Sequence, residues 1–197
     1  MNEPTSLSLL DHVTDSADTE SWQRLASIYT PLLRVWIRKY ELQDSDADDL
    51  VQEVLLTVSR ELSSFEHSGR TGAFRSWLRT ILVHRLKNFW RSREYRPAAK
   101  GGSSLLDQLK ELEDESSNAS RIWNAEHDQH VLARLLEQIR PRFQESTWEA
   151  FRRQMFGGES ADAVAADLKT RVHTVYVAKS RVLNALRTEA SGLIDNL

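Results

Sequence analysis

The chain has 197 residues, enough for one large or two small domains, and its 40% hydrophobic content can build cores of ordinary size. The absence of cysteine excludes disulfides and thiolate zinc sites, while seven glycines and four prolines leave few breaks and favour long helices. The net charge of −3 hides a strong local contrast, because residues 67–100 hold 9 Lys and Arg against 1 acid, whereas residues 1–66 hold 5 against 13. Such a local positive excess predicts a surface for phosphate.

The N-terminal twenty residues lack the basic start and long apolar run of a signal peptide. No window approaches the roughly twenty apolar residues that cross a bilayer. We therefore expect a soluble, cytoplasmic protein without membrane insertion.

The first half of the chain shows three helical patterns. From Glu20 to Tyr40, apolar residues recur at three- and four-residue steps, and Pro31 is expected to kink this helix or to lie in a first turn. A second helix is predicted from about Asp46 to Leu62. A loop over residues 63–73 then leads to a third helix from about Phe74 to Arg93.

The second half begins with a change of composition. Small, polar and acidic residues with a brief apolar pattern at Leu105–Leu112 predict a flexible acidic tether. A helical pattern resumes at about Arg121, and Pro141 and the Gly157–Gly158 pair divide the remainder into three further helices. The predicted fold is all-α, with a helical domain over 1–97, a flexible linker over 98–120 and a second helical domain over 121–197.

Residues 160–186 have the apolar spacing of a helix-turn-helix. Ala165 would lie where the two helices cross closely, and Lys169 occupies the turn position usually given to a left-handed Gly. The second helix, from about Val172, would present side chains that can bond phosphates or base edges. An ordinary helical hairpin with a solvated face fits the same spacing. The outward residues would be Arg171, His173, Thr174, Tyr176, Val177, Lys179, Ser180 and Arg181.

Two further patterns carry chemistry. Acids at Asp46, Asp48 and Asp49 would stabilise a first helical turn, which explains them without any function. Asp49, Gln52 and Glu53 also form a polar stripe opposite the apolar face, which suits a basic partner helix. In the third predicted helix, aromatic side chains could stack on unpaired bases while arginines hold the backbone of a separated strand.

The segments DADDLVQEVLLTVSREL and FRSWLRTILVHRLKNFWRSR together resemble region 2 of bacterial extracytoplasmic-function (ECF) sigma factors of RNA polymerase. The helix-turn-helix resembles region 4 of the same family, so the resemblance covers roughly residues 20–190. It implies a non-enzymatic subunit without metal or cofactor, a monomer when free, that binds core RNA polymerase and promoter DNA. The family is commonly held inactive by an anti-sigma factor between the two domains, and its acidic tether threads through basic channels of the polymerase.

The resemblance also implies roles for individual residues. Core polymerase binding falls on Asp48, Asp49, Gln52 and Glu53. Recognition and melting of the −10 element fall on Phe65, Phe74, Arg75, Trp77, Arg79, His84, Lys87, Asn88, Trp90 and Arg91. Recognition of the −35 element falls on Arg171, His173, Thr174, Tyr176, Lys179, Ser180 and Arg181. Trp77 is expected in the core and Phe65 in a functional role. His84 replaces the family's common Asn, and Tyr176 and Val177 replace its common Lys-Ser, so base preferences do not carry over.

Three other interpretations of these patterns stay open. His127 and His130 are one helical turn apart beside Glu126, a spacing that could hold a metal but more often belongs to surface residues. The chain could also be a free-standing helix-turn-helix regulator, which should bind duplex DNA without a polymerase. An acidic tether that is merely solvated would have the same composition.

Overall fold

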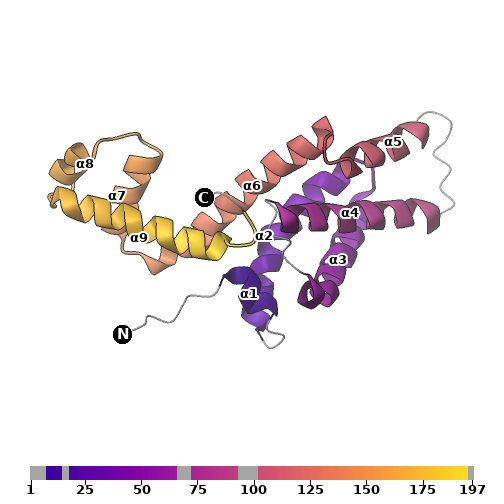
Figure 1. The fold of residues 1–197 in the computed structure, drawn as a ribbon, viewed down its shortest axis with the longest axis horizontal. Helices are drawn as coiled ribbons and strands as arrows, with labels where there is room; N and C mark the ends of the chain where they lie inside the picture. The colour runs from indigo at the N-terminus through magenta and orange to yellow at the C-terminus, as the bar shows by residue number, and fades with distance from the viewer. Residues whose placement is uncertain (1–7, 15–17, 66–71, 93–101, 195–197) are drawn as a thin grey trace.

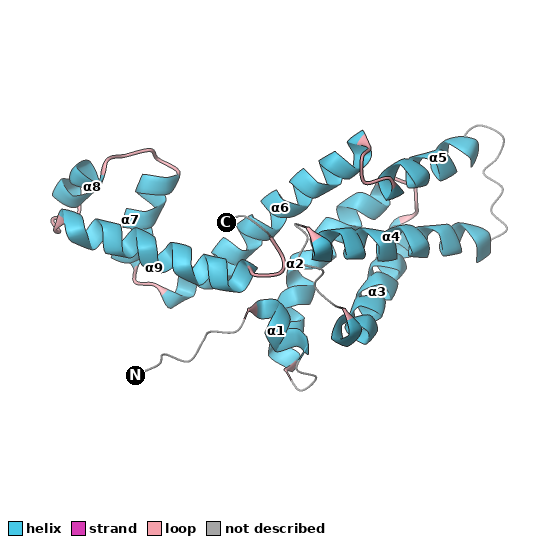
Figure 2. Ribbon diagram, in the orientation of Figure 1, coloured by secondary structure: helices cyan, strands magenta, loops and turns pink. Residues whose placement is uncertain are grey.

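The structure is a computed structural model that describes residues 8–14, 18–65, 72–92 and 102–194. Within these residues it is built of helices and short 3₁₀ turns without a strand, so the predicted all-α class is confirmed (Figure 2). None of the described helices is both long and apolar enough to cross a membrane. The α-helices are α1 (Leu9–Thr14), α2 (Thr19–Arg38), α3 (Asp44–Glu61), α4 (Ala73–Ser92), α5 (Gly102–Glu113), α6 (Asn118–Ile139), α7 (Glu145–Met155), α8 (Ala161–Asp167) and α9 (Val172–Ala190).

The first three long helices pack around one apolar centre. Asp18 caps α2 by accepting a hydrogen bond from the Ser21 amide at 3.0 Å, and α2 continues through Pro31 to Arg38 instead of starting there. The helical steps of the sequence put apolar stripes of α2, α3 and α4 into contact, as the periodicity predicts. Buried members of this core include Ile28, Leu33, Ile37, Leu50, Val54, Leu78 and Leu82.

The stretch predicted as a flexible tether contains a packed helix. Helix α5 lies against both α4 and α6, and the side chains of Leu109 and Leu112 are fully buried. Burial of such a leucine contributes about 1.5–3 kcal/mol, enough to hold a short amphipathic helix in place. The brief Leu105–Leu112 pattern therefore marks a core-facing helix, and the tether prediction is corrected for residues 102–113.

Helix α6 runs between the two halves of the molecule (Figure 1). Its N-terminal part packs on α2 and α5, where Trp123 is fully buried and stacks edge-on against Trp36 at 5.0 Å. Its C-terminal part packs on α9, and Val131 and Leu135 are fully buried. Helix α6 starts at Asn118, just before the predicted boundary at residue 121, and its buried side chains share one core with α2, α3, α4 and the end of α9.

The two ends of the described chain meet beside α2. Helix α1, which no sequence pattern predicted, packs on α2 and on α9. Gly192, just after α9, has φ +80°, and a Cβ atom there would come within 3.0 Å of Leu10 Cδ2. Glycine therefore allows both the left-handed turn and the close approach of α1.

Candidate nucleic-acid interface

Helix α3 exposes a polar row on the side away from the core. Asp49, Gln52 and Glu53 are exposed, as the predicted stripe requires. Asp48 is half-buried and accepts a hydrogen bond from Arg34 Nε at 2.7 Å, so its carboxylate is engaged with α2. Leu56 continues the row and is 54% exposed. Sequence reasoning missed Leu56, although its position off the apolar stripe and close to Glu53 was visible in the helical spacing.

Three aromatic side chains cluster at the start of α4. Phe74 is 1% exposed and contacts Tyr29 at 5.6 Å, so it belongs to the core and is closed to DNA in this conformation. Phe65 and Trp77 are half-buried, with their rings 4.8 Å apart. Because a stacked base must reach a free ring face, Phe65 and Trp77 are better placed for this than Phe74.

Further along α4, His84, Asn88 and Arg91 are exposed. Their spacing of four and three residues brings them to one face of the helix. Trp90 is half-buried and packs edge-on against Phe89 at 5.4 Å. This face is the part of the predicted −10 surface that solvent reaches freely.

Three other basic side chains of α4 are paired with acidic side chains from α5, α6 and the turn between them. Arg75 Nη1 lies 2.6 Å from Asp128 Oδ2, and Lys87 Nζ lies 2.7 Å from Glu113 Oε2. The Arg79 side chain is 3% exposed and its Nη2 lies 3.6 Å from Glu115. Burial lowers the pKa of Arg79, and its buried Nη1 has no hydrogen-bond partner among the residues that the structure describes. Arg79, like Phe74, is therefore closed to DNA in this conformation.

The two histidines that could have held a metal instead join α6 to α2. His127 is fully buried, its Nε2 lies 3.1 Å from the Tyr29 hydroxyl, and its Nδ1 lies 2.9 Å from Asp128. His130 Nε2 lies 2.7 Å from the Ile28 carbonyl oxygen. Both rings are engaged in packing between helices.

In the C-terminal half, α8, a short turn and α9 follow one another where the sequence predicts a helix-turn-helix, and the two helices are in contact. Ser160 caps α8 by accepting a hydrogen bond from the Ala163 amide, and Lys169 adopts φ +51° in the turn, the left-handed conformation expected there. Ala165 is 3% exposed between the helices, and α9 begins at Val172. The side chains predicted to face DNA are exposed except Lys179, which is half-buried; they are Arg171, His173, Thr174, Tyr176, Lys179, Ser180 and Arg181.

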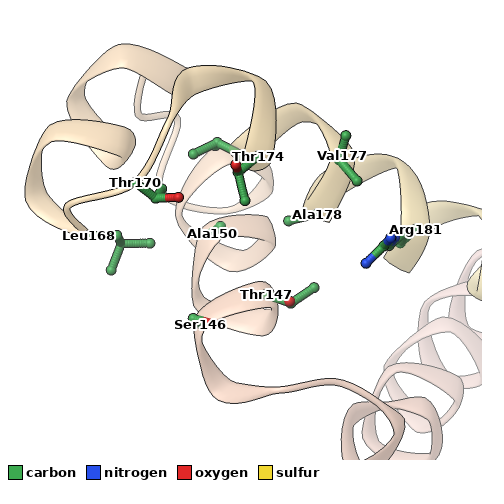
Figure 3. A pocket seen from close by; sticks show the side chains of 10 residues that line it. Ser146, Thr147, Ala150, Leu168, Thr170, Thr174, Val177, Ala178 and Arg181 are labelled. Carbon is green, nitrogen blue, oxygen red and sulfur yellow. The ribbon is translucent and has the colours of Figure 1, made fainter.

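A small hollow of about 100 Å³ lies between α7 and α9 (Figure 3). Its lining is mixed: five residues are apolar, and the polar ones are Ser146, Thr147, Thr170, Thr174 and Arg181. Hydroxyl and guanidinium donors next to a recognition helix are the groups that hold phosphate oxygens in protein–DNA contacts.

Residues 25–95 match the family model of sigma-70 region 2. The chain contains a sigma-70 region 2. The match supports the assignment of this chain to the sigma-70 family. The matched residues include α3, α4 and most of α2. The acids Glu113, Glu115 and Asp128, which pair with Lys87, Arg79 and Arg75, lie outside the matched residues. No curated protein matches the chain.

Proposed function

We propose that this protein is a sigma factor of the ECF type that binds core RNA polymerase in the bacterial cytoplasm and directs recognition and melting of promoters. The observation that carries the proposal is the region 2 match over residues 25–95. Bond formation belongs to the polymerase in this scheme, and the protein acts as its specificity subunit.

In this proposal, the exposed row of α3 docks on a basic surface of the polymerase. Asp49, Gln52 and Glu53 supply the polar contacts, and Leu56 adds an apolar one. Protein interfaces combine an apolar centre with a polar rim, and Leu56 beside the polar row would supply both kinds of contact. Asp48 would act mainly by holding α3 to α2 through Arg34.

The DNA contacts in this proposal fall on two helices. The −10 element would meet the α4 face of His84, Asn88 and Arg91, with Phe65 and Trp77 as stacking surfaces for unpaired bases. The −35 element would meet α9 in a major groove, as in other helix-turn-helix proteins. The exposed side chains of α9, and the threonines and Arg181 around the hollow beside it, support this assignment.

The proposal is tested with the double variant Asp49→Lys and Glu53→Lys. Because both side chains are exposed, we expect the variant to fold like wild type and to lose about 100-fold or more in affinity for purified bacterial core polymerase. Gel filtration measures the complex, and transcription from a promoter library then measures initiation by it.

The matched control is Glu20→Lys with Glu137→Lys, which makes the same charge change at exposed positions on α2 and α6. We expect this control to co-elute with core polymerase and to support initiation. If wild type does not co-elute and instead binds duplex DNA tightly by itself, the protein is a free-standing helix-turn-helix regulator. Co-elution of the Asp49→Lys and Glu53→Lys variant would remove α3 from the interface.

A further inference from the structure

Helix α4 carries two sets of polar side chains that differ in their access to solvent. His84, Asn88 and Arg91 are exposed, whereas Arg75, Arg79 and Lys87 have side-chain exposures of 13%, 3% and 22%. Each of these three basic side chains is within ion-pair distance of an acidic side chain from the segment 113–128. We call the three acids Glu113, Glu115 and Asp128 the acidic cover; α5, α6 and the turn between them hold these acids against α4.

Apolar packing and charge together hold the acidic cover on α4. Leu109 and Leu112 are fully buried where α5 meets α4 and α6. Ser120 fixes the turn between α5 and α6, because its hydroxyl donates a hydrogen bond to the Leu112 carbonyl at 2.8 Å. Trp123 Nε1 donates to the Arg75 carbonyl at 3.2 Å, which ties α6 to the first turn of α4. The acids are therefore placed by a folded segment.

The cover compensates Arg79 incompletely. Its guanidinium is buried, and within the described part of the chain Nη1 has no hydrogen-bond partner. Glu115 lies 3.6 Å from Nη2, and the Glu115 side chain is 76% exposed. A buried charge without full hydrogen bonding is unfavourable compared with the same charge in water or on a phosphate. Arg79 thus favours states in which α4 is uncovered.

We propose that the acidic cover is an autoinhibitory element that occupies the phosphate-binding bases of α4 in the free protein and leaves α4 when single-stranded promoter DNA binds. Carboxylates at these bases satisfy the same donors that phosphate oxygens would satisfy, so acid and DNA compete for one surface. The proposal rests on the proposed function, since it takes α4 to be the helix that binds the melted strand.

The test compares two double variants that remove equal charge. Glu113→Gln with Glu115→Gln weakens the cover, whereas Asp107→Asn with Glu137→Gln neutralises two exposed acids that pair with Lys110 and Arg134, away from the α4 bases. The probe is a fluorescently labelled, A/T-rich single-stranded DNA oligonucleotide, titrated with the full chain in the absence of polymerase. Circular dichroism melting verifies that each variant is folded, and Glu115→Gln alone serves as a milder variant.

We expect the Glu113→Gln and Glu115→Gln variant to bind the oligonucleotide about fivefold more tightly than wild type, because two partly exposed ion pairs that compete with DNA are lost. Its log–log dependence of affinity on salt should also be steeper, since salt no longer weakens a competing contact. The Asp107→Asn and Glu137→Gln control should bind like wild type. An equal gain of affinity in both variants would assign the effect to net charge. No gain in either would mean that the ion pairs of Glu113 and Glu115 have only a structural role. Either result overturns the proposal.

Failure of the inference and failure of the proposed function give different results. If wild type forms an active complex with core polymerase but the Glu113→Gln and Glu115→Gln variant shows no gain in DNA binding, the cover is structural and the sigma assignment stands. If the gain is present but wild type does not bind core polymerase, the cover stands as a regulator of DNA binding and the sigma assignment fails.

Discussion

His127 lies fully buried between α2 and α6 with both ring nitrogens engaged. Asp128 can accept but not donate when it is ionised, so Nδ1 carries the proton and Nε2 accepts from the Tyr29 hydroxyl. Burial lowers the pKa of His127; the hydrogen bond to Asp128 opposes this effect, while Arg75 and His130 add to it. The folded protein therefore favours the neutral form of the His127 ring.

This network makes stability depend on pH in a defined direction. Because the pKa of His127 is lowered from its ordinary 6.5, this site binds more protons in the unfolded chain than in the folded chain as the pH falls below 6.5. The free energy of unfolding should then fall as pH drops below about 6.5, by up to about 1.4 kcal/mol per pH unit from this group. Urea denaturation between pH 5 and pH 8 measures it. The variant His127→Gln should be less stable at neutral pH but should lose this part of the slope; an unchanged slope would contradict the assignment.

Residue types alone could not sort the aromatic and basic side chains of α4 into core and surface. Phe74 and Phe65 look alike in sequence, yet Phe74 is buried against Tyr29 whereas Phe65 is half-buried. Arg79 looks like a phosphate contact and is nevertheless buried, because α5 and α6 cover that side of α4. The exposed positions of α3 and α9 were predictable, since a single helical stripe decides them.

At the scale of elements, strong periodicity predicted α2, α3, α4 and the helix-turn-helix to within a few residues. Helix α5 was missed because its acidic, small residues resemble those of a linker, and its stability comes from burial of Leu109 and Leu112 against neighbours. Helix α1 was missed because it has only six residues, too few to show a helical period, and one of its two partners, α9, is far away in sequence. Tertiary contacts of this kind leave little local signal.

If α5 leaves α4 together with the acidic cover, this helix should open without unfolding of the rest of the domain. The variant Leu109→Ala removes a fully buried side chain, which should weaken α5 packing by about 2–4 kcal/mol. We expect amide hydrogen exchange in residues 102–113 to accelerate about 30-fold or more, with little change in α2. Hydrogen exchange measured by mass spectrometry on peptides from both helices tests this. Equal acceleration in α2 would mean that α5 opens only when the whole core unfolds.

At the scale of the whole molecule, the two halves are connected by shared contacts as well as by the chain. Arg24 Nη2 on α2 lies 2.7 Å from Glu189 Oε2 on α9, and Arg142 Nη1 lies 2.6 Å from the other Glu189 oxygen. Helix α6 contacts both α2 and α9. Release of the acidic cover would loosen α6 from α2, so uncovering α4 and freeing the helix-turn-helix should be coupled.

This coupling predicts that the two halves move apart when the proposed sigma factor binds core polymerase and promoter DNA. The chain has no cysteine, so thiol-reactive dyes label only the cysteines that are introduced. The variant Thr80→Cys with Ala166→Cys places one dye at an exposed position on α4 and one on α8. We expect energy transfer between the dyes to fall when the initiation complex forms, and to be lower in the free Glu113→Gln and Glu115→Gln background than in wild type. A dye pair at Met155→Cys on α7 and Ala166→Cys on α8, two helices that contact each other, should report no change. An active initiation complex with unaltered transfer between α4 and α8 would show that α4 is used without separation of the halves, and that the contacts through α6 and Glu189 persist on the promoter.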